Sequence, residues 1–191
     1  MFAIEIDVEK EPICELTLSE LPYATEVLSF VPGLNAGFGE SEFPEVVLGL
    51  PKGGGGESGS LHVLSLGVAG EIVLTFGERR IIDGEGPDFV IFENPFAIGG
   101  DASNPFAELA QVSVSNDGEN WISFGCDSAG DYPWTGCAGW QLVNKFEGCA
   151  THIDSGATGG DLFDLQDLGI EEVRFIRIID FIFCNPINKE S

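Results

Sequence analysis

Short apolar runs and strict alternation of apolar and polar side chains dominate this chain, and both patterns predict β-strands. Residues 2–8, FAIEIDV, place phenylalanine, isoleucine and valine on one face and acidic side chains on the other. A period of two residues is typical of a half-buried strand. Continuous apolar runs at residues 71–76, 89–92 and 173–180 predict strands in the core of a sheet. No long amphipathic helix is predicted anywhere in the sequence.

A β-hairpin is the clearest local element. Val112 and Val114 alternate with polar residues, and residues 121–124 form the predicted return strand. Between them, Asp117-Gly118 supplies the residue types that a tight turn with positive φ requires. A further strand is predicted at residues 61–66, and a weaker strand pattern occurs at residues 13–18. Residues 24–30 fit either a short helix or a strand.

The composition favours a single all-β sandwich domain over residues 1–191. The chain holds 26 glycines, 10 prolines and 15 phenylalanines among its 191 residues. Its length suits one domain of generous size. Short strands joined by irregular loops, without repeats, are typical of antiparallel sandwiches with little helix.

The charge excludes several classes of partner. Acidic residues number 32 and basic residues 8, which gives a formal net charge of −24. Nucleic-acid binding needs a basic surface, and anionic membranes repel an acidic one, so neither is an expected partner. Three interpretations of the acidic surplus are open: bound cations such as Ca²⁺, a high-salt environment, or simple solubility.

The sequence predicts no membrane span and shows no secretion signal. No run of about 18 apolar residues is present. The start of the chain, MFAIEIDVEKEP, lacks the basic and long apolar regions of a signal peptide. The protein is therefore expected to be cytoplasmic or virion-borne, or else a signal has been removed from this chain.

The five cysteines suit a stapled loop better than a metal site. None forms a CxxC pair, and the two histidines are not spaced for zinc. Cys126 and Cys137 fall in one glycine- and tryptophan-rich loop and are the favoured disulfide pair. The alternative is free, buried thiols. An odd count leaves at least one cysteine unpaired within the chain; the partners of Cys14, Cys149 and Cys184 stay open.

An acidic loop at residues 83–94 is the candidate metal site. Ca²⁺ takes six to eight oxygen ligands from carboxylates, carbonyls and amides. Glycines in this loop let the backbone fold around a cation, and a second acidic loop would contribute if it lay at the same end of the sandwich. The candidate ligands are Asp83, Asp88, Glu93 and Asn94, with Asp161 and Asp164 from the second loop. In the alternative interpretation, Asp83 and Asp88 form turns and Asp164 caps a short turn.

Aromatic residues in the long loop are the candidate ligand site. Tyr132, Trp134 and Trp140 are predicted to form a platform on which sugar rings stack. The alternative is that these rings pack the loop onto the sheet, and Trp121 is expected to lie in the core. No GxSxG motif is present, and the histidines give no triad spacing. We therefore expect a protein without enzymatic activity.

Two resemblances extend this picture. The hairpin VSVSNDGENWISF, followed later by VRFIRIID, resembles the discoidin-type, or galactose-binding-like, domains. This resemblance covers roughly the second half of the chain and implies an eight-stranded jelly-roll sandwich. The resemblance thus adds the jelly-roll arrangement to the all-β sandwich that the apolar and polar pattern predicts.

The second resemblance covers most of the chain. The strings DGEGPDFVIFEN and GGDLFDL, with the strands around them, resemble an uncharacterised family of secreted bacterial cell-surface proteins and lipoproteins. The resemblance implies an extracellular jelly roll and no enzyme activity. The chain departs from that family's pattern in showing no signal peptide and in ending soon after VRFIRIID. Residues 2–8, or a strand from a partner chain, are expected to fill the edge of the sheet.

Together these observations predict a non-enzymatic extracellular or cell-surface binding module. It would recognise a glycan or a surface protein, with structural Ca²⁺ holding its loops. Two alternatives are open. One is a structural subunit of a filament, surface layer or virion that self-assembles through β-edges. The other is an accessory carbohydrate-binding domain of a glycoside-processing enzyme.

Overall fold

The computed structural model describes residues 3–6, 23–52, 59–143 and 159–181. The described chain forms antiparallel sheets joined by long loops, which confirms the predicted all-β sandwich. The jelly-roll strand order stays a prediction. Within the described residues, helical structure consists of three short 3-10 helices, η2 (Glu40–Glu42), η3 (Glu45–Val47) and η4 (Leu165–Leu168). Among the described residues, no helix is both long and apolar enough to cross a bilayer.

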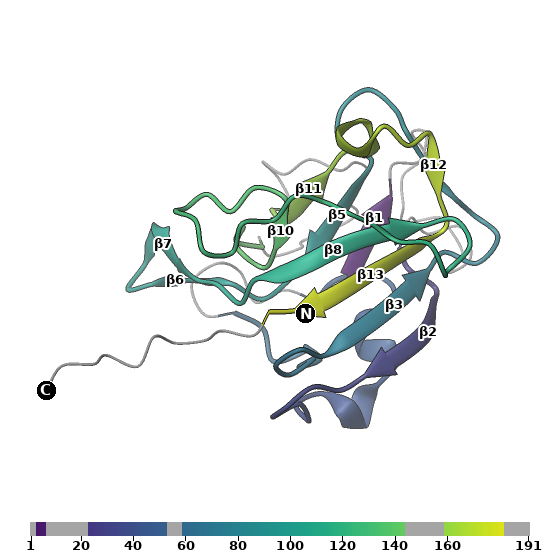
Figure 1. Ribbon diagram of the computed structural model, residues 1–191. Helices are drawn as coiled ribbons and strands as arrows, with labels where there is room; N and C mark the ends of the chain where they lie inside the picture. Colours follow the sequence, from purple (N-terminus) through teal and green to yellow (C-terminus); the bar gives the residue numbers. More distant parts are fainter. Residues whose placement is uncertain (1–2, 7–22, 53–58, 144–158, 182–191) are drawn as a thin grey trace, which may run out of the picture.

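The larger sheet has the strand order β10-β8-β13-β3-β2, with β9 also paired to β8. Figure 1 shows β8, β13, β3 and β2 side by side in that order. β13 pairs with β3 on one side and β8 on the other, so its apolar run is central, as predicted. The strands are β2 (Glu26–Val31), β3 (Glu71–Thr75), β8 (Ala110–Ser115), β9 (Ile122–Ser123), β10 (Cys137–Ala138) and β13 (Phe175–Asp180).

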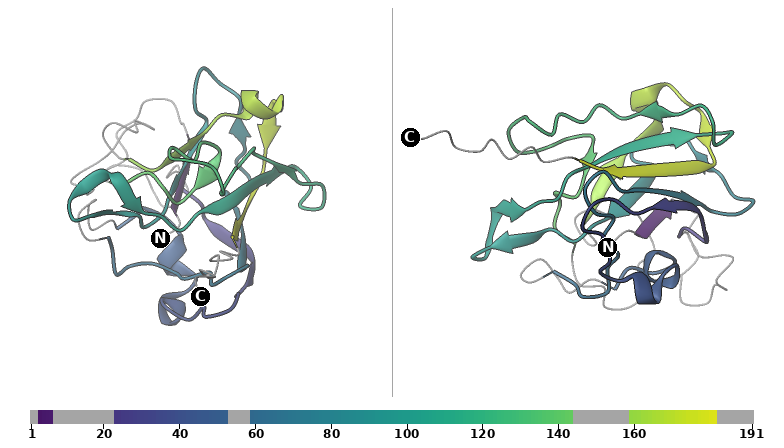
Figure 2. Two further views of the ribbon diagram at one scale, coloured as in Figure 1. Left: turned by 60° about the vertical axis from the view of Figure 1, so that its left-hand side comes forward. Right: turned by 60° about the horizontal axis from the view of Figure 1, so that its bottom comes forward.

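The smaller sheet lies behind the larger one and has the order β1-β5-β11 (Figures 1 and 2). Its strands are β1 (Ala3–Ile6), β5 (Phe89–Phe92) and β11 (Asp161–Phe163). The described part of the predicted strand at residues 2–8 therefore does fill a sheet edge. Two small ribbons complete the fold, and the second projects from the body (Figure 1): β4 (Ile81–Ile82) with β12 (Glu172–Val173), and β6 (Phe96–Ile98) with β7 (Asp101–Phe106).

The core lies between the two sheets. Alternate residues of β3, β8 and β13 face Phe89 and Ile91 of β5 and Phe163 of β11 in one cluster of buried side chains. Phe89 stacks on Phe163 with ring centroids 5.1 Å apart. The opposite face of β5 is also buried, because Val90 and Phe92 pack with Val143 in a second cluster. β5 is thus buried on both faces, which explains its unbroken apolar run.

Several local expectations need correction. Residues 61–66 are not a strand. The side chains of Leu64 and Leu66 are buried, and this burial accounts for the alternation of apolar and polar residues in this stretch. The backbone there makes only scattered bonds to a neighbouring loop, such as Ser65 N–H to the Phe38 carbonyl, instead of a ladder. The stretch at residues 24–30 is a strand and not a helix, since β2 covers Glu26–Val31. The predicted strand at residues 13–18 lies outside the described residues.

The hairpin of β8 and β9 is present, with a longer turn than predicted. Gly118 adopts φ 76°, as the Asp-Gly pair predicted. Asp117 keeps negative φ and instead organises the turn through its carboxylate, which accepts bonds from the backbone N–H groups of Glu119 and Asn120. These bonds hold the pKa of Asp117 well below its usual value. Trp121 is only partly buried and lies against Arg177, with the guanidinium 4.5 Å from the ring centroid.

Candidate functional site

β5 carries an acidic residue at each end. Asp88 comes immediately before the strand and Glu93 immediately after it. β11 is antiparallel to β5, so Asp164, just beyond β11, lies near Asp88, while Asp161 lies toward Glu93. The six predicted metal ligands therefore divide between opposite ends of the sandwich, and they cannot all serve one ion.

Three of the predicted ligands meet at the Asp88 end. One carboxylate oxygen from each of Asp83, Asp88 and Asp164 lies within 4.8 Å of the other two. Oxygens bound to one Ca²⁺ at about 2.4 Å are at most about 4.8 Å apart, so the spacing fits a shared cation. The Oδ1 atom of Asp83 is buried and has no hydrogen-bond partner among the described residues. The three side chains thus form a compact set of hard oxygen donors.

The same carboxylates also shape the local backbone, as the alternative interpretation predicted. Asp88 accepts from Gly84 N–H at 2.8 Å through Oδ1 and from Leu165 N–H at 2.7 Å through Oδ2. Asp164 caps η4 by accepting from Gln166 N–H at 2.8 Å. Burial raises the pKa of Asp88, and the nearby charges of Asp164 and Asp83 raise it further. Each carboxylate oxygen has a second lone pair, so these bonds do not preclude metal ligation.

The other three predicted ligands have different surroundings. Asn94 joins loop to loop by accepting from the backbone N–H of Ser60 and donating to its carbonyl. Glu93 is buried and lines a cavity of about 250 Å³ together with Glu108 and Asp180. Asp161 is buried and accepts backbone hydrogen bonds from the aromatic loop.

The acidic groups around this cavity have strongly shifted protonation equilibria. Burial raises the pKa of Glu93 to about 8, and the carboxylates of Asp161, Glu108 and Asp180 add to the effect. Burial, with the charge of Glu108, raises the pKa of Asp180 to about 6. Glu108 and Asp180 were not predicted, because only the fold brings them beside Glu93 from distant parts of the chain.

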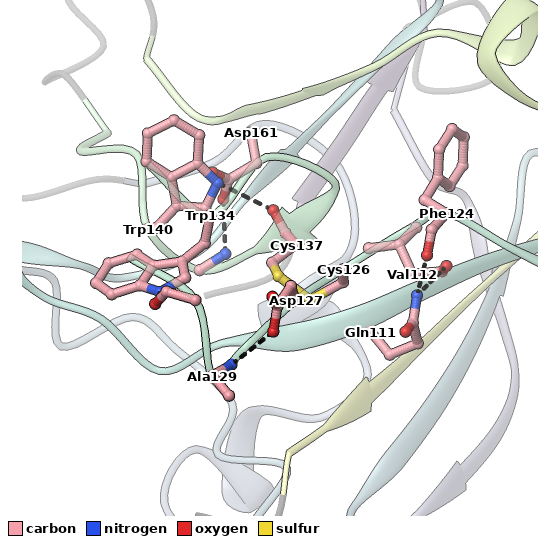
Figure 3. Close-up of a disulfide and its surroundings, with 12 residues drawn as sticks. Gln111, Val112, Phe124, Cys126, Asp127, Ala129, Trp134, Cys137, Trp140 and Asp161 are labelled. Carbon is pink, nitrogen blue, oxygen red and sulfur yellow. Dashed lines mark hydrogen bonds between the residues drawn. A yellow bond between two sulfur atoms is a disulfide. The ribbon is translucent and has the colours of Figure 1, made fainter. Parts of the chain in front are cut away.

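The predicted aromatic site lies on the loop that carries the Cys126–Cys137 pair, and Figure 3 shows Trp134 and Trp140 beside this pair. Cys126 and Cys137 are at bonding distance, with Cα atoms 4.7 Å apart, as the sequence predicted. The ring of Tyr132 packs edge-on against Trp134 and Trp140, at centroid distances of 5.6 and 5.5 Å. Tyr132 is 45% exposed and both tryptophans are partly exposed. The structure therefore brings all three predicted residues together at the surface.

Internal hydrogen bonds fix these rings. The indole N–H of Trp134 donates to the Gly130 carbonyl at 2.9 Å, and that of Trp140 donates to the Cys137 carbonyl at 3.1 Å. Figure 3 shows both indole rings on the same side of the disulfide. Because both polar N–H groups bond within the loop, what the tryptophans offer a ligand is ring surface.

Asp161 ties the aromatic loop to the small sheet. Its Oδ2 accepts from Gly139 N–H at 2.6 Å and its Oδ1 from Gln141 N–H at 3.0 Å. Gly139 has φ 94°, and a Cβ there would lie 2.1 Å from the Glu108 carbonyl, so no other residue fits. Burial raises the pKa of Asp161 to about 7, although the backbone bonds from Gly139, Gln141 and Trp140 act against the shift.

No protein-family model matches the chain, and searches of curated proteins and of solved structures find no significant match.

Proposed function

We propose that this protein is a non-enzymatic extracellular or cell-surface module that binds a glycan on the rings of Tyr132, Trp134 and Trp140. The observation that carries the proposal is the gathering of three partly exposed aromatic side chains on one cross-linked loop. A disulfide in this loop suits an oxidising compartment. The resemblance to secreted bacterial surface proteins points the same way.

The arrangement suits a saccharide for two physical reasons. Aromatic rings present large apolar faces that pack against the C–H face of a sugar ring, and the exposed Tyr132 adds a hydroxyl group. The rings are also held before binding by the disulfide and by the two indole bonds. A preorganised site loses little conformational freedom when it binds, which favours affinity for weakly interacting ligands.

Glycan-array binding of the intact chain tests this proposal. We expect a signal that is lost in Trp134→Ala and Trp140→Ala. Trp121→Ala is the matched control, because that indole covers Arg177 and contacts no member of the platform in the described structure. The array signal of Trp121→Ala should equal that of the wild type. No binding by a folded wild-type chain, or equal loss in all three variants, would contradict the glycan site.

We further propose that Ca²⁺ binds Asp83, Asp88 and Asp164 and stabilises the loops at the opposite end of the sandwich. The three close carboxylates repel one another without a cation, and the buried Oδ1 of Asp83 gains a partner when one binds. An ion that binds only the folded state stabilises it by about 2.7 kcal/mol at 100 times its dissociation constant.

Calorimetric melting with Ca²⁺ and with EDTA tests this cation site. The Tm should rise with Ca²⁺ in the wild type and should not respond in Asp83→Asn. Asp167→Asn is the control, because Asp167 is an exposed carboxylate in η4, outside the cluster. A Tm that is the same in Ca²⁺ and in EDTA would refute the proposal.

Self-assembly through a sheet edge is the second candidate function. In the described part of the chain, β2 pairs only with β3, and its Leu28 and Val31 are 47% and 58% exposed. An apolar edge strand is a template for pairing with another chain. Light scattering separates the two functions: polymers that disappear in Leu28→Lys support assembly, and a monomer at all concentrations opposes it.

A further inference from the structure

A groove follows the outer edge of β2. Among the described residues, β2 forms a backbone ladder with β3 alone, and Figure 1 shows it as the last strand of the larger sheet. The groove has a volume of about 460 Å³ and is lined by all of residues 25–30. Successive residues of a strand point to opposite faces of the sheet, so a groove that contacts every one of them runs along the strand's edge. Such an edge presents backbone N–H and C=O groups to an incoming strand.

Apolar residues form the rest of the groove lining. Phe43, Pro44 and Leu48 come from the segment that contains η2 and η3. The ring centroids of Phe43 and Phe30 are 5.1 Å apart. Phe30, Phe43 and Leu48 are partly buried and pack against the core, which holds the lining in place. A strand added at this edge would therefore place every second side chain against a fixed apolar surface.

Acidic side chains flank the groove. Residues 26–51 contain no lysine or arginine, and their four acidic residues are all exposed: Glu26, Glu40, Glu42 and Glu45. Glu26 lines the groove, and the other three belong to η2 and η3. Glu42 already faces His62 at 3.6 Å, so the remaining three carboxylates are those that a basic partner would meet. Solvent screens exposed charges, so this attraction acts over about 8 Å.

The same charges argue against a second copy of this chain as the occupant. Two copies paired through β2 would bring equivalent glutamates together, and each chain carries a formal net charge of −24. Like charges that face one another weaken binding, whereas lysine or arginine opposite these glutamates strengthens it. Charge complementarity therefore favours a basic strand from another protein.

We propose that β2 binds an extended, basic segment of a partner protein, which adds a strand to the larger sheet. The backbone of this segment bonds to the edge of β2, and every second side chain is apolar and packs on Phe43 and Leu48. Its lysine or arginine side chains lie opposite Glu26 and Glu45. Strand β10, which belongs to the aromatic loop, lies at the other edge of the sheet, so peptide binding is independent of glycan binding.

Capped heptapeptides of alternating residues test the proposal by calorimetric titration of the full chain. The lysine–valine peptide should bind, and the glutamate–valine peptide should bind about tenfold more weakly or worse. Two further lysine–valine peptides carry N-methyl groups, one on the valine amides and one on the lysine amides. Because an extended peptide directs alternate N–H groups to opposite edges, one of these two should lose about tenfold in affinity while the other keeps it. Equal affinities of the two N-methylated peptides, or no binding of the lysine–valine peptide, would overturn the proposal.

Two charge-reversal variants locate the binding. Glu26→Lys/Glu45→Lys should weaken binding of the lysine–valine peptide about tenfold. Glu119→Lys/Asp167→Lys is the matched control, because it changes the net charge by the same amount and both residues are exposed outside the groove. Its affinity should stay within about twofold of the wild type. Circular dichroism checks that each variant folds. Equal weakening in both folded variants would mean that the peptide responds only to net charge, and would refute the site.

Light scattering of the wild-type chain tests the other occupant of this edge. The chain alone should be monomeric, or its oligomers should dissociate when the lysine–valine peptide is added. Oligomers that the peptide does not dissociate would assign the edge of β2 to a second copy and overturn the proposal.

Discussion

Replacing Asp161 should detach the aromatic loop from the small sheet. This carboxyl is 1% exposed and accepts from the backbone N–H groups of Gly139 and Gln141. In Asp161→Ala, the buried Gly139 N–H and the partly buried Gln141 N–H both lose their acceptor. Each such group costs about 1–3 kcal/mol, and the loss of a buried carboxyl offsets part of this cost. We expect the free energy of unfolding to fall by about 3 kcal/mol.

The conservative variant Asp161→Asn refines the prediction. Its amide keeps one oxygen acceptor but turns an N–H donor toward the second backbone N–H. The expected loss is about 1–2 kcal/mol, between the wild type and the alanine variant. Asp167→Ala, an exposed carboxyl of η4, is the control and should lie within about 0.5 kcal/mol of the wild type.

Urea denaturation followed by circular dichroism measures these free energies, and its pH dependence adds an independent readout. The folded-state pKa of Asp161, about 7, is above its usual 3.8, so the folded protein binds the extra proton between these values. Wild-type stability should therefore fall as pH rises through this window, and Asp161→Asn should lack that part of the decline. An Asp161→Ala variant within about 0.5 kcal/mol of the wild type would refute the role of Asp161 in holding the loop.

Two further predictions concern the rest of the molecule. The folded-state pKa of Glu93, about 8, is above its usual 4.5, so the stability linked to its protonation is greatest at low pH and is lost as pH rises through 8. In urea titrations, Glu93→Gln should remove on the order of 3 kcal/mol of this decline between pH 4.5 and 7. A pH dependence of stability equal to that of the wild type would contradict this prediction. Cys126→Ser/Cys137→Ser should lower the free energy of unfolding by about 3 kcal/mol, because the bond closes a loop of 11 residues' separation; no change in the denaturation midpoint would oppose it.

Local patterns were enough to predict the strands with one-sided or complete burial. β3, β5 and β13 follow from their apolar runs and β8 follows from its alternation, because a buried strand face needs apolar side chains whatever its neighbours. The Cys126–Cys137 bond and the aromatic cluster also follow from residues close in sequence. The pattern failed at residues 61–66, where side chains alternate but the backbone makes no ladder.

The division of the acidic residues was beyond the sequence. Asp161 begins β11 and Asp164 directly follows that strand, yet the antiparallel pairing with β5 directs them toward opposite ends of the sandwich. The packing of the aromatic loop against Asp161 makes that carboxylate a buried acceptor, whereas Asp164 lies beside Asp83 and Asp88. The sequence supplies the carboxylates, while nonlocal strand pairing decides what each one contacts.

The three indole N–H resonances give the most direct test of the proposed glycan site. The chain has three tryptophans, so a nitrogen-edited NMR spectrum should contain three separable indole signals. On titration with a glycan that binds on the array, the signals of Trp134 and Trp140 should shift in proportion to occupancy while that of Trp121 stays in place. Binding that leaves the Trp134 and Trp140 signals unmoved would contradict the proposal that the aromatic loop is the binding site.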